Sequence, residues 1–129
     1  MRILLDTQAI LYAFAYPERL PYAWEISLKS KSNQFFVSAA SPWEVAIKSK
    51  DRKPDFFNAD PYAILEGCRL SGFRLLDITP EVAVAAGKLP LHHKDPFDRV
   101  IIAHAMRLGV PVMTTDRKFK LYDVDLVSA

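Results

Sequence analysis

Short apolar runs alternate along the chain with longer segments whose apolar residues recur at helical spacing. Short runs bounded by turn residues are typical of buried strands, and the longer segments are typical of helices packed on them. The predicted strands cover 2–5, 35–38, 73–76, 110–114 and 124–127. The predicted helical segments cover 8–15, 20–31, 42–48, 61–71, 80–87, 96–108 and 117–121. This alternation indicates an α/β domain with a mostly parallel sheet of about five strands.

Several helix boundaries carry residues that are typical of helix ends. Ser41 precedes Pro42 and stands three residues before Glu44, which predicts a helix capped by Ser41, with Glu44 completing a capping box. Thr79 precedes Pro80 in the same way. Gly109 follows the longest helical segment, where a glycine commonly ends a helix.

Composition limits the possible classes of protein. The 129 residues fit one domain spanning 1–129, and 17 basic against 15 acidic residues give no overall charge that favours nucleic acid. The single cysteine, Cys68, excludes an intramolecular disulfide and a cysteine-rich metal site. No apolar run is long enough for a signal peptide or a membrane span, so we expect a cytoplasmic protein that does not bind membranes.

Four acidic residues occupy equivalent places in this pattern. Asp6 ends the first strand and Asp116 lies just past the fourth, whereas Glu44 and Asp98 lie in the first turns of predicted helices. In a right-handed parallel sheet, the carboxyl ends of the strands and the starts of the helices that follow them share one edge. We therefore expect the four acids to converge there, with Asp98 joining if the loop at 88–95 returns to that edge.

Four carboxylates in one cleft repel one another unless their pKa values rise or a cation neutralises them. Carboxylate-rich sites without cysteine suit Mg²⁺ or Mn²⁺, and one or two such ions can support phosphodiester hydrolysis. Each acid also has a purely structural interpretation: Glu44 in a capping box, Asp98 with Asp95 at a helix start, and Asp116 in a turn or cap. Asp95 is either a capping residue or an accessory metal ligand.

Basic and histidine residues lie near the predicted site. Four basic residues follow Glu44 and form either a solvated face or a phosphate-binding patch, namely Lys48, Lys50, Arg52 and Lys53. His92 and His93 lie in the loop before Asp95 and could contact substrate or metal. His104 lies within a helix and is interpreted as a packed or surface residue.

Over essentially its whole length the chain resembles PIN-domain proteins of the VapC-like toxin group. The resemblance rests on four segments: LLDTQAILYAF, VSAASPWEVAIK, LPLHHKDPFDRVIIAHA and VMTTDRKF. It implies a three-layer α/β/α fold and an Mg²⁺- or Mn²⁺-dependent ribonuclease toxin, with Thr114 supporting the four acids. It also implies a cognate antitoxin and a homodimer. The chain departs from the pattern at Gln8 and at the segment SKDRKPDF, which follows Lys48.

The leading hypothesis is a metal-dependent endoribonuclease, probed by Asp6→Asn and Asp98→Asn. One alternative is a binding module that acts mainly through its antitoxin in a DNA-bound repressor complex and contacts DNA only indirectly. A second alternative is a phosphoacceptor domain of receiver type. Asp77, which follows the third predicted strand, would then be the acceptor.

Overall fold

The computed structural model describes residues 1–51 and 58–129. Its centre is a parallel sheet of four strands in the order β3-β2-β1-β4. The strands are β1 (Arg2–Leu5), β2 (Gln34–Ser38), β3 (Arg74–Leu76) and β4 (Val112–Met113). The α/β class and the parallel sheet predicted from the sequence are thus confirmed.

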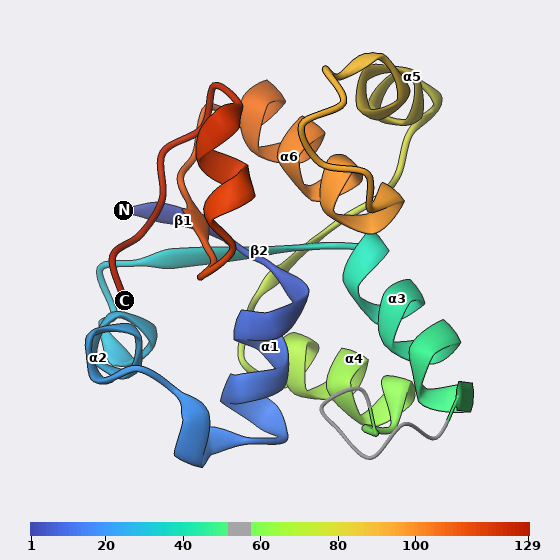
Figure 1. Cartoon of the computed structure of the whole chain (residues 1–129). Coiled ribbons are helices and arrows are strands. Elements are labelled where there is room, and N and C mark those ends of the chain that lie inside the picture. Colours follow the sequence, from blue (N-terminus) through green and yellow to red (C-terminus); the bar gives the residue numbers. More distant parts are fainter. Residues whose placement is uncertain (52–57) are drawn as a thin grey trace.

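Helices cover both faces of the sheet (Figure 1). One face carries α1 (Thr7–Phe14), α2 (Tyr22–Lys29) and α4 (Pro61–Leu70). The other face carries α5 (Pro80–Lys88) and α6 (Pro96–Leu108), while α3 (Ala40–Lys48) contributes residues to both layers. Short 3₁₀ turns complete the described elements: η1 (Pro17–Arg19), η2 (Ser49–Asp51) and η3 (Arg117–Leu121).

The alternation of side chains along the central strands divides the core in two. In β1, Leu4 packs into the layer of α5 and α6, whereas Ile3 and Leu5 pack into the layer of α1, α2 and α4. In β2, Phe36 and Phe35 separate in the same way. Because successive strand residues point to opposite faces, continuous apolar strands are what a sheet covered on both sides requires.

The predicted fifth strand is wrong in detail. Residues 124–127 do not form a strand, and Leu126 makes only an isolated parallel bridge to Val112. The neighbouring strand β4 is also shorter than the predicted 110–114, partly because Pro111 has no backbone N–H to donate. Because β4 has only two residues, it offers few backbone groups with which residues 124–127 could pair as a strand.

The predicted start of α3 is also wrong. The helix begins at Ala40, and no side chain caps it. Instead, the Ser38 hydroxyl at the end of β2 accepts the Ala40 N–H at 3.1 Å. Ser41 is buried within the helix, where its hydroxyl accepts a hydrogen bond from Thr7 of α1 at 3.0 Å.

Other helix ends match the sequence prediction. The Thr79 hydroxyl accepts from the Val82 N–H at the start of α5. Gly109 ends α6 with φ of 65°, a left-handed conformation that glycine adopts without a side-chain clash. Within the described residues, no helix is long and apolar enough to cross a membrane.

Candidate functional site

A pocket of about 170 Å³ opens at the carboxyl edge of the sheet. All four predicted acids line it, each from a different element. Its described lining residues are Asp6, Thr7, Gln8, Glu44, Lys48, Asp95, Asp98 and Asp116. The tertiary structure therefore brings together side chains that lie up to 110 residues apart in the sequence, from position 6 to position 116.

Asp6 directly follows β1 and is the N-cap of α1, where its carboxylate accepts the Ala9 N–H at 2.7 Å. The side chain is only 4% exposed. Burial raises the pKa of Asp6 to about 7, and the charges of Glu44 and Asp116 add to the rise. Hydrogen bonds from Thr114 and Ala9 oppose it by stabilising the charged carboxylate.

Asp98 lies in the first turn of α6, as predicted. Burial raises the pKa of Asp98 to about 8, and the negative charges of Asp95, Glu44, Asp6 and Asp116 raise it further. Two carboxyls of this pocket, Asp6 and Asp98, thus hold protons near neutral pH in the absence of a cation. This electrostatic strain is what a bound cation would relieve.

Glu44 lies in the middle of α3 and is 3% exposed. The capping-box interpretation is wrong, because the helix begins at Ala40 rather than after Ser41. One carboxylate oxygen, Oε2, accepts a hydrogen bond from Lys48. The other, Oε1, is buried and has no hydrogen-bond partner among the described residues. A buried carboxylate oxygen without a partner is costly, so this atom is suited to a ligand that the protein itself does not supply.

Asp116 combines a capping role with a place in the pocket. Its Oδ1 accepts the Lys118 N–H at 2.9 Å and caps η3, while Oδ2 lies 2.9 Å from His93 Nε2. The backbone N–H of Asp116 donates to the Thr114 hydroxyl at 3.0 Å. Since Thr114 also hydrogen-bonds Asp6, it links two of the four acids, which is the position that a supporting residue needs.

Asp95 likewise has two contacts of different kinds. Its Oδ1 accepts the N–H groups of Phe97 and Asp98, at 2.8 and 3.2 Å, and so caps α6. Its Oδ2 lies 3.6 Å from Lys48 Nζ. The capping interpretation is therefore confirmed, and Oδ2 still faces the pocket.

Lys48 is the predicted basic residue that reaches the pocket. It pairs with Glu44 and lies near Asp95. Burial lowers the pKa of Lys48, but hydrogen bonding to Glu44 and the surrounding negative charges raise it more, so the net shift is upward. Lys50 is exposed on η2 and does not line the pocket. Arg52 and Lys53 lie outside the described residues.

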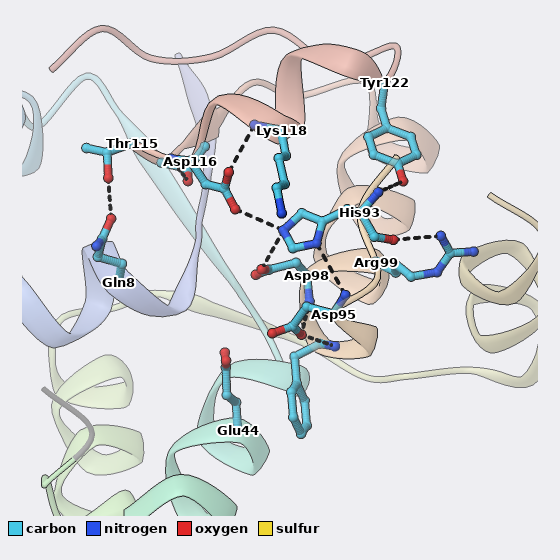
Figure 2. Close-up of polar contacts among 12 residues, drawn as sticks. Gln8, Glu44, His93, Asp95, Asp98, Arg99, Thr115, Asp116, Lys118 and Tyr122 are labelled. Atoms are coloured by element: carbon cyan, nitrogen blue, oxygen red, sulfur yellow. Dashed lines mark hydrogen bonds and ion pairs between the residues drawn. The ribbon is translucent and has the colours of Figure 1, made fainter. Parts of the chain in front are cut away.

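The sequence named His92 and His93 together as possible contacts of substrate or metal, and the structure places His93 at the centre of the site (Figure 2). Its ring is buried and Nε2 lies 2.9 Å from both Asp98 Oδ2 and Asp116 Oδ2. The adjacent His92 is exposed and packs edge-on against Tyr122. Both histidines stand in the same short loop, and no sequence pattern distinguishes the one that turns inward. His104 is packed, as predicted, between Ser38 and the Asp77 carbonyl.

The donor atoms of the pocket fit a hard divalent cation. Oxygen atoms of four carboxylates face one space, and Glu44 Oε1 lacks a partner among the described residues. Separately, ligand atoms of His93, Asp98 and Asp116 lie within 4.8 Å of one another, close enough for one ion. Carboxylate oxygens are the ligands that Mg²⁺ and Mn²⁺ prefer.

Comparison with known proteins identifies the family. The model of the PIN domain family matches residues 3–125. The chain belongs to this family. The PIN-domain resemblance inferred from the sequence is therefore confirmed, as is the expected fold of helices on both faces of a parallel sheet. No curated protein matches the chain in sequence.

Solved structures similar to this PIN domain include proteins of VapBC systems. DNA-bound VapBC from Salmonella typhimurium aligns with a TM-score of 0.70 at 18% identity, covering 98% of this chain and 97% of that one. Rickettsia felis VapBC2, bound to a promoter DNA fragment, gives 0.68 at 20% identity, with 98% of each chain covered. Mycobacterium tuberculosis VapC20, described as a Sarcin-Ricin loop cleaving toxin, gives 0.68 at 14% identity, with 98% and 99% covered. These similarities concern the fold.

The receiver-type alternative loses its support. Asp77 follows β3, which lies at the outer end of the sheet order, and it is exposed. It is not among the residues that line the acidic pocket. Its backbone carbonyl instead contacts the His104 ring.

Proposed function

We propose that this PIN domain is a divalent-metal-dependent endoribonuclease and the toxin of a type II toxin–antitoxin pair. The observation that carries the proposal is the convergence of Asp6, Glu44, Asp98 and Asp116 on one pocket. Independent helix caps need not share a pocket, and Glu44 is not a cap at all. Membership of the PIN domain family supports the same conclusion.

Asp6, Asp98 and Asp116 would hold the principal ion, and Glu44 would complete the site or share a second ion. A bound Mg²⁺ or Mn²⁺ would supply Lewis-acid chemistry, activating a water and stabilising the leaving oxygen. The chain's own residues prepare for this. Thr114 fixes the carboxylate of Asp6 and the backbone of Asp116, and burial keeps competing water from Asp6 and Glu44.

RNA is the proposed substrate. The similar fold of VapC20, a toxin described as cleaving the Sarcin-Ricin loop, supports this choice. Lys48 at the pocket and exposed Lys50 on the following turn place positive charge beside the acids, where a nucleic acid backbone would have to approach. We also propose Arg52 and Lys53, which follow in the sequence, as RNA-binding residues.

An antitoxin is the proposed protein partner, and DNA would be contacted only through it. The support is that several structures of similar fold are VapBC complexes, two of which are bound to DNA. We also expect a homodimer and a cytoplasmic location.

The proposed activity is tested with purified protein, an RNA substrate and Mn²⁺, with a chelator as the metal-free control. Asp6→Asn and Asp98→Asn should each lower the cleavage rate by about 100-fold or more, because each removes a metal-binding charge from a preorganised site. Asp123→Asn, at an exposed acid outside the pocket, is the matched control. Full activity in both site variants would show that the metal site is misassigned.

The alternative function is a binding module with little catalysis of its own, acting in a DNA-bound repressor complex. The DNA-bound VapBC structures are the observation that favours it. Expressing the chain alone in a bacterial host separates the two. Growth arrest that disappears in Asp98→Asn supports the nuclease, and arrest that persists in that variant, or no arrest at all, supports the binding module.

A further inference from the structure

His93 has the residue type and the position of a metal ligand. Its Nε2 lies 2.9 Å from carboxylate oxygens of both Asp98 and Asp116. A histidine beside two acids at such distances is a common metal-binding arrangement. The hydrogen bonds on the other side of the ring decide whether Nε2 has a lone pair to offer.

The second ring nitrogen of His93 faces a backbone donor. The Asp95 N–H points at His93 Nδ1 at 3.2 Å. A backbone N–H can only donate, so Nδ1 must carry a lone pair and accept. In the neutral ring the single proton then resides on Nε2. A protonated Nε2 can donate to Asp116 Oδ2, lies equally 2.9 Å from Asp98 Oδ2, and has no lone pair for a metal ion.

The loop that carries His93 is fixed on both sides of the residue (Figure 2). Its backbone N–H donates to the Tyr122 hydroxyl at 2.8 Å, and its carbonyl accepts from Arg99 Nη1 at 3.0 Å. Tyr122 in turn donates to the Pro90 carbonyl at 2.6 Å. The Phe119 ring packs edge-on against the imidazole. These contacts hold the ring in the orientation that directs Nε2–H at Asp98 and Asp116.

We propose that His93 is a positioning residue whose Nε2–H bridges Asp98 and Asp116 and sets the separation of their carboxylates for a cation, and that it is not itself a ligand. Besides the Oδ2 that His93 contacts, each carboxylate has a second oxygen, which in Asp116 also accepts the Lys118 N–H. Hydrogen bonds to metal-binding carboxylates orient them and tune the affinity of a site. The inference rests on the proposed function for the presence of the cation, but not for the RNA substrate.

The proposal is tested by spectroscopy on the full chain labelled with ¹⁵N-histidine. His93→Gln assigns the His93 signals among the three histidines. In the metal-free protein, NMR should show a proton on Nε2 and an unprotonated Nδ1. After Mn²⁺ is added, pulsed EPR should show no nitrogen bonded directly to the ion. A directly bonded nitrogen that disappears in His93→Gln, or a proton on Nδ1, would overturn the proposal.

Binding measurements supply a second readout that does not depend on activity. His93→Leu removes the bridge and should weaken Mn²⁺ binding by about 10- to 100-fold, as losses of such supporting hydrogen bonds usually do. His93→Gln places an amide N–H near the Nε2 position and should recover most of the affinity. His92→Leu, at the exposed neighbour, is the matched control.

The outcomes separate this proposal from the proposed function. Wild-type affinity in His93→Leu, or no recovery in His93→Gln, would overturn the role of His93 alone. If the wild-type chain binds no Mn²⁺, the metal-dependent function fails and the role of His93 toward a cation fails with it. If His93→Leu does not fold, the wild-type NMR and EPR spectra still decide the question.

Discussion

The negative charges of the pocket are compensated differently on its two sides. On the side of α6 and η3, a buried histidine bridges Asp98 and Asp116 through 2.9 Å contacts. On the side of α3, the ammonium group of Lys48 pairs with Glu44 and approaches Asp95. The His93–Asp116 contact joins residues 23 apart in sequence, whereas the Lys48–Glu44 contact joins two residues one helical turn apart. The first contact therefore depends on tertiary structure, and the second lies within a single helix.

This difference predicts which substitutions should disturb the site most. The His93 side needs a rigid loop, and its rigidity comes from Arg99 and Tyr122. The Lys48–Glu44 pair lies within helix α3, so substitutions on this side should have smaller effects on stability.

Arg99→Met should have the largest effect. Arg99 is 7% exposed and donates to four backbone carbonyls, those of Gly87 near the end of α5 and of the loop residues Leu89, Pro90 and His93. Removing a buried group that donates to four carbonyls, of which Pro90 keeps its hydrogen bond from Tyr122, should lower the free energy of unfolding by about 3 kcal/mol or more. Denaturant unfolding measures this loss, and the ¹⁵N-histidine spectrum should show that His93 has lost its fixed environment. Arg107→Met, on the same helix, is the control. Equal losses in both variants would contradict the role of Arg99 in holding the loop that carries His93.

The pH dependence of stability should be the next largest effect. The pKa values of Asp6 and Asp98 are raised to about 7 and about 8 in the folded, metal-free protein. Between their ordinary values and these raised ones, the folded state binds more protons than the unfolded state, so stability falls as pH rises. We expect the metal-free protein to lose at least about 2 kcal/mol between about pH 5 and about pH 8.

Mn²⁺ should restore this lost stability at the higher pH, because it takes the place of the protons. Asp98→Asn should flatten the profile, since it removes one titrating group of the pair. Thermal unfolding across this pH range measures both effects. Stability that rises with pH in the metal-free protein would contradict the raised pKa values.

Tyr122→Phe should have an intermediate effect. The hydroxyl accepts from the His93 N–H and donates to the Pro90 carbonyl. Its removal leaves the His93 N–H without this partner, while the Pro90 carbonyl keeps its hydrogen bond from Arg99. We expect a loss of about 1–2 kcal/mol in the free energy of unfolding. Weaker Mn²⁺ binding should accompany it if the loop positions His93. Tyr62→Phe, at an exposed residue of α4, is the control.

Lys48→Met should have the smallest effect on stability. Its side chain is 33% exposed, so solvent screening limits the pair with Glu44 to about 1 kcal/mol. The same change should raise Mn²⁺ affinity, because the Glu44 carboxylate loses its internal counter-ion. Calorimetric titration with Mn²⁺ measures this. If Lys48→Met binds Mn²⁺ more weakly than the wild type, Lys48 supports the site rather than competing with the metal ion.

Much of the fold followed from local signals in the sequence. The apolar runs at 2–5 and 35–38 gave the central strands, and Thr79, Asp95 and Gly109 stand where helices begin and end. These features depend on neighbours within one turn, so the sequence contains them directly. The start of α3 was wrong because Ser41 resembles a cap, but a contact with Thr7 of another helix holds it inside.

The sequence by itself determined which residues could form an acidic site and on which edge of the sheet they would lie. Strand direction and helix order suffice for that, since parallel strands end at one edge. Only the tertiary structure decided that Glu44 is a buried pocket residue, with one oxygen that has no partner in the described part of the chain, and that His93, not His92, turns inward. The inward orientation of His93 depends on Arg99 and Tyr122, which contact its loop from elements beyond it, and on Asp95 at the end of the loop. Contacts between elements leave no periodic pattern in the sequence, and for this reason they became visible only in the folded chain.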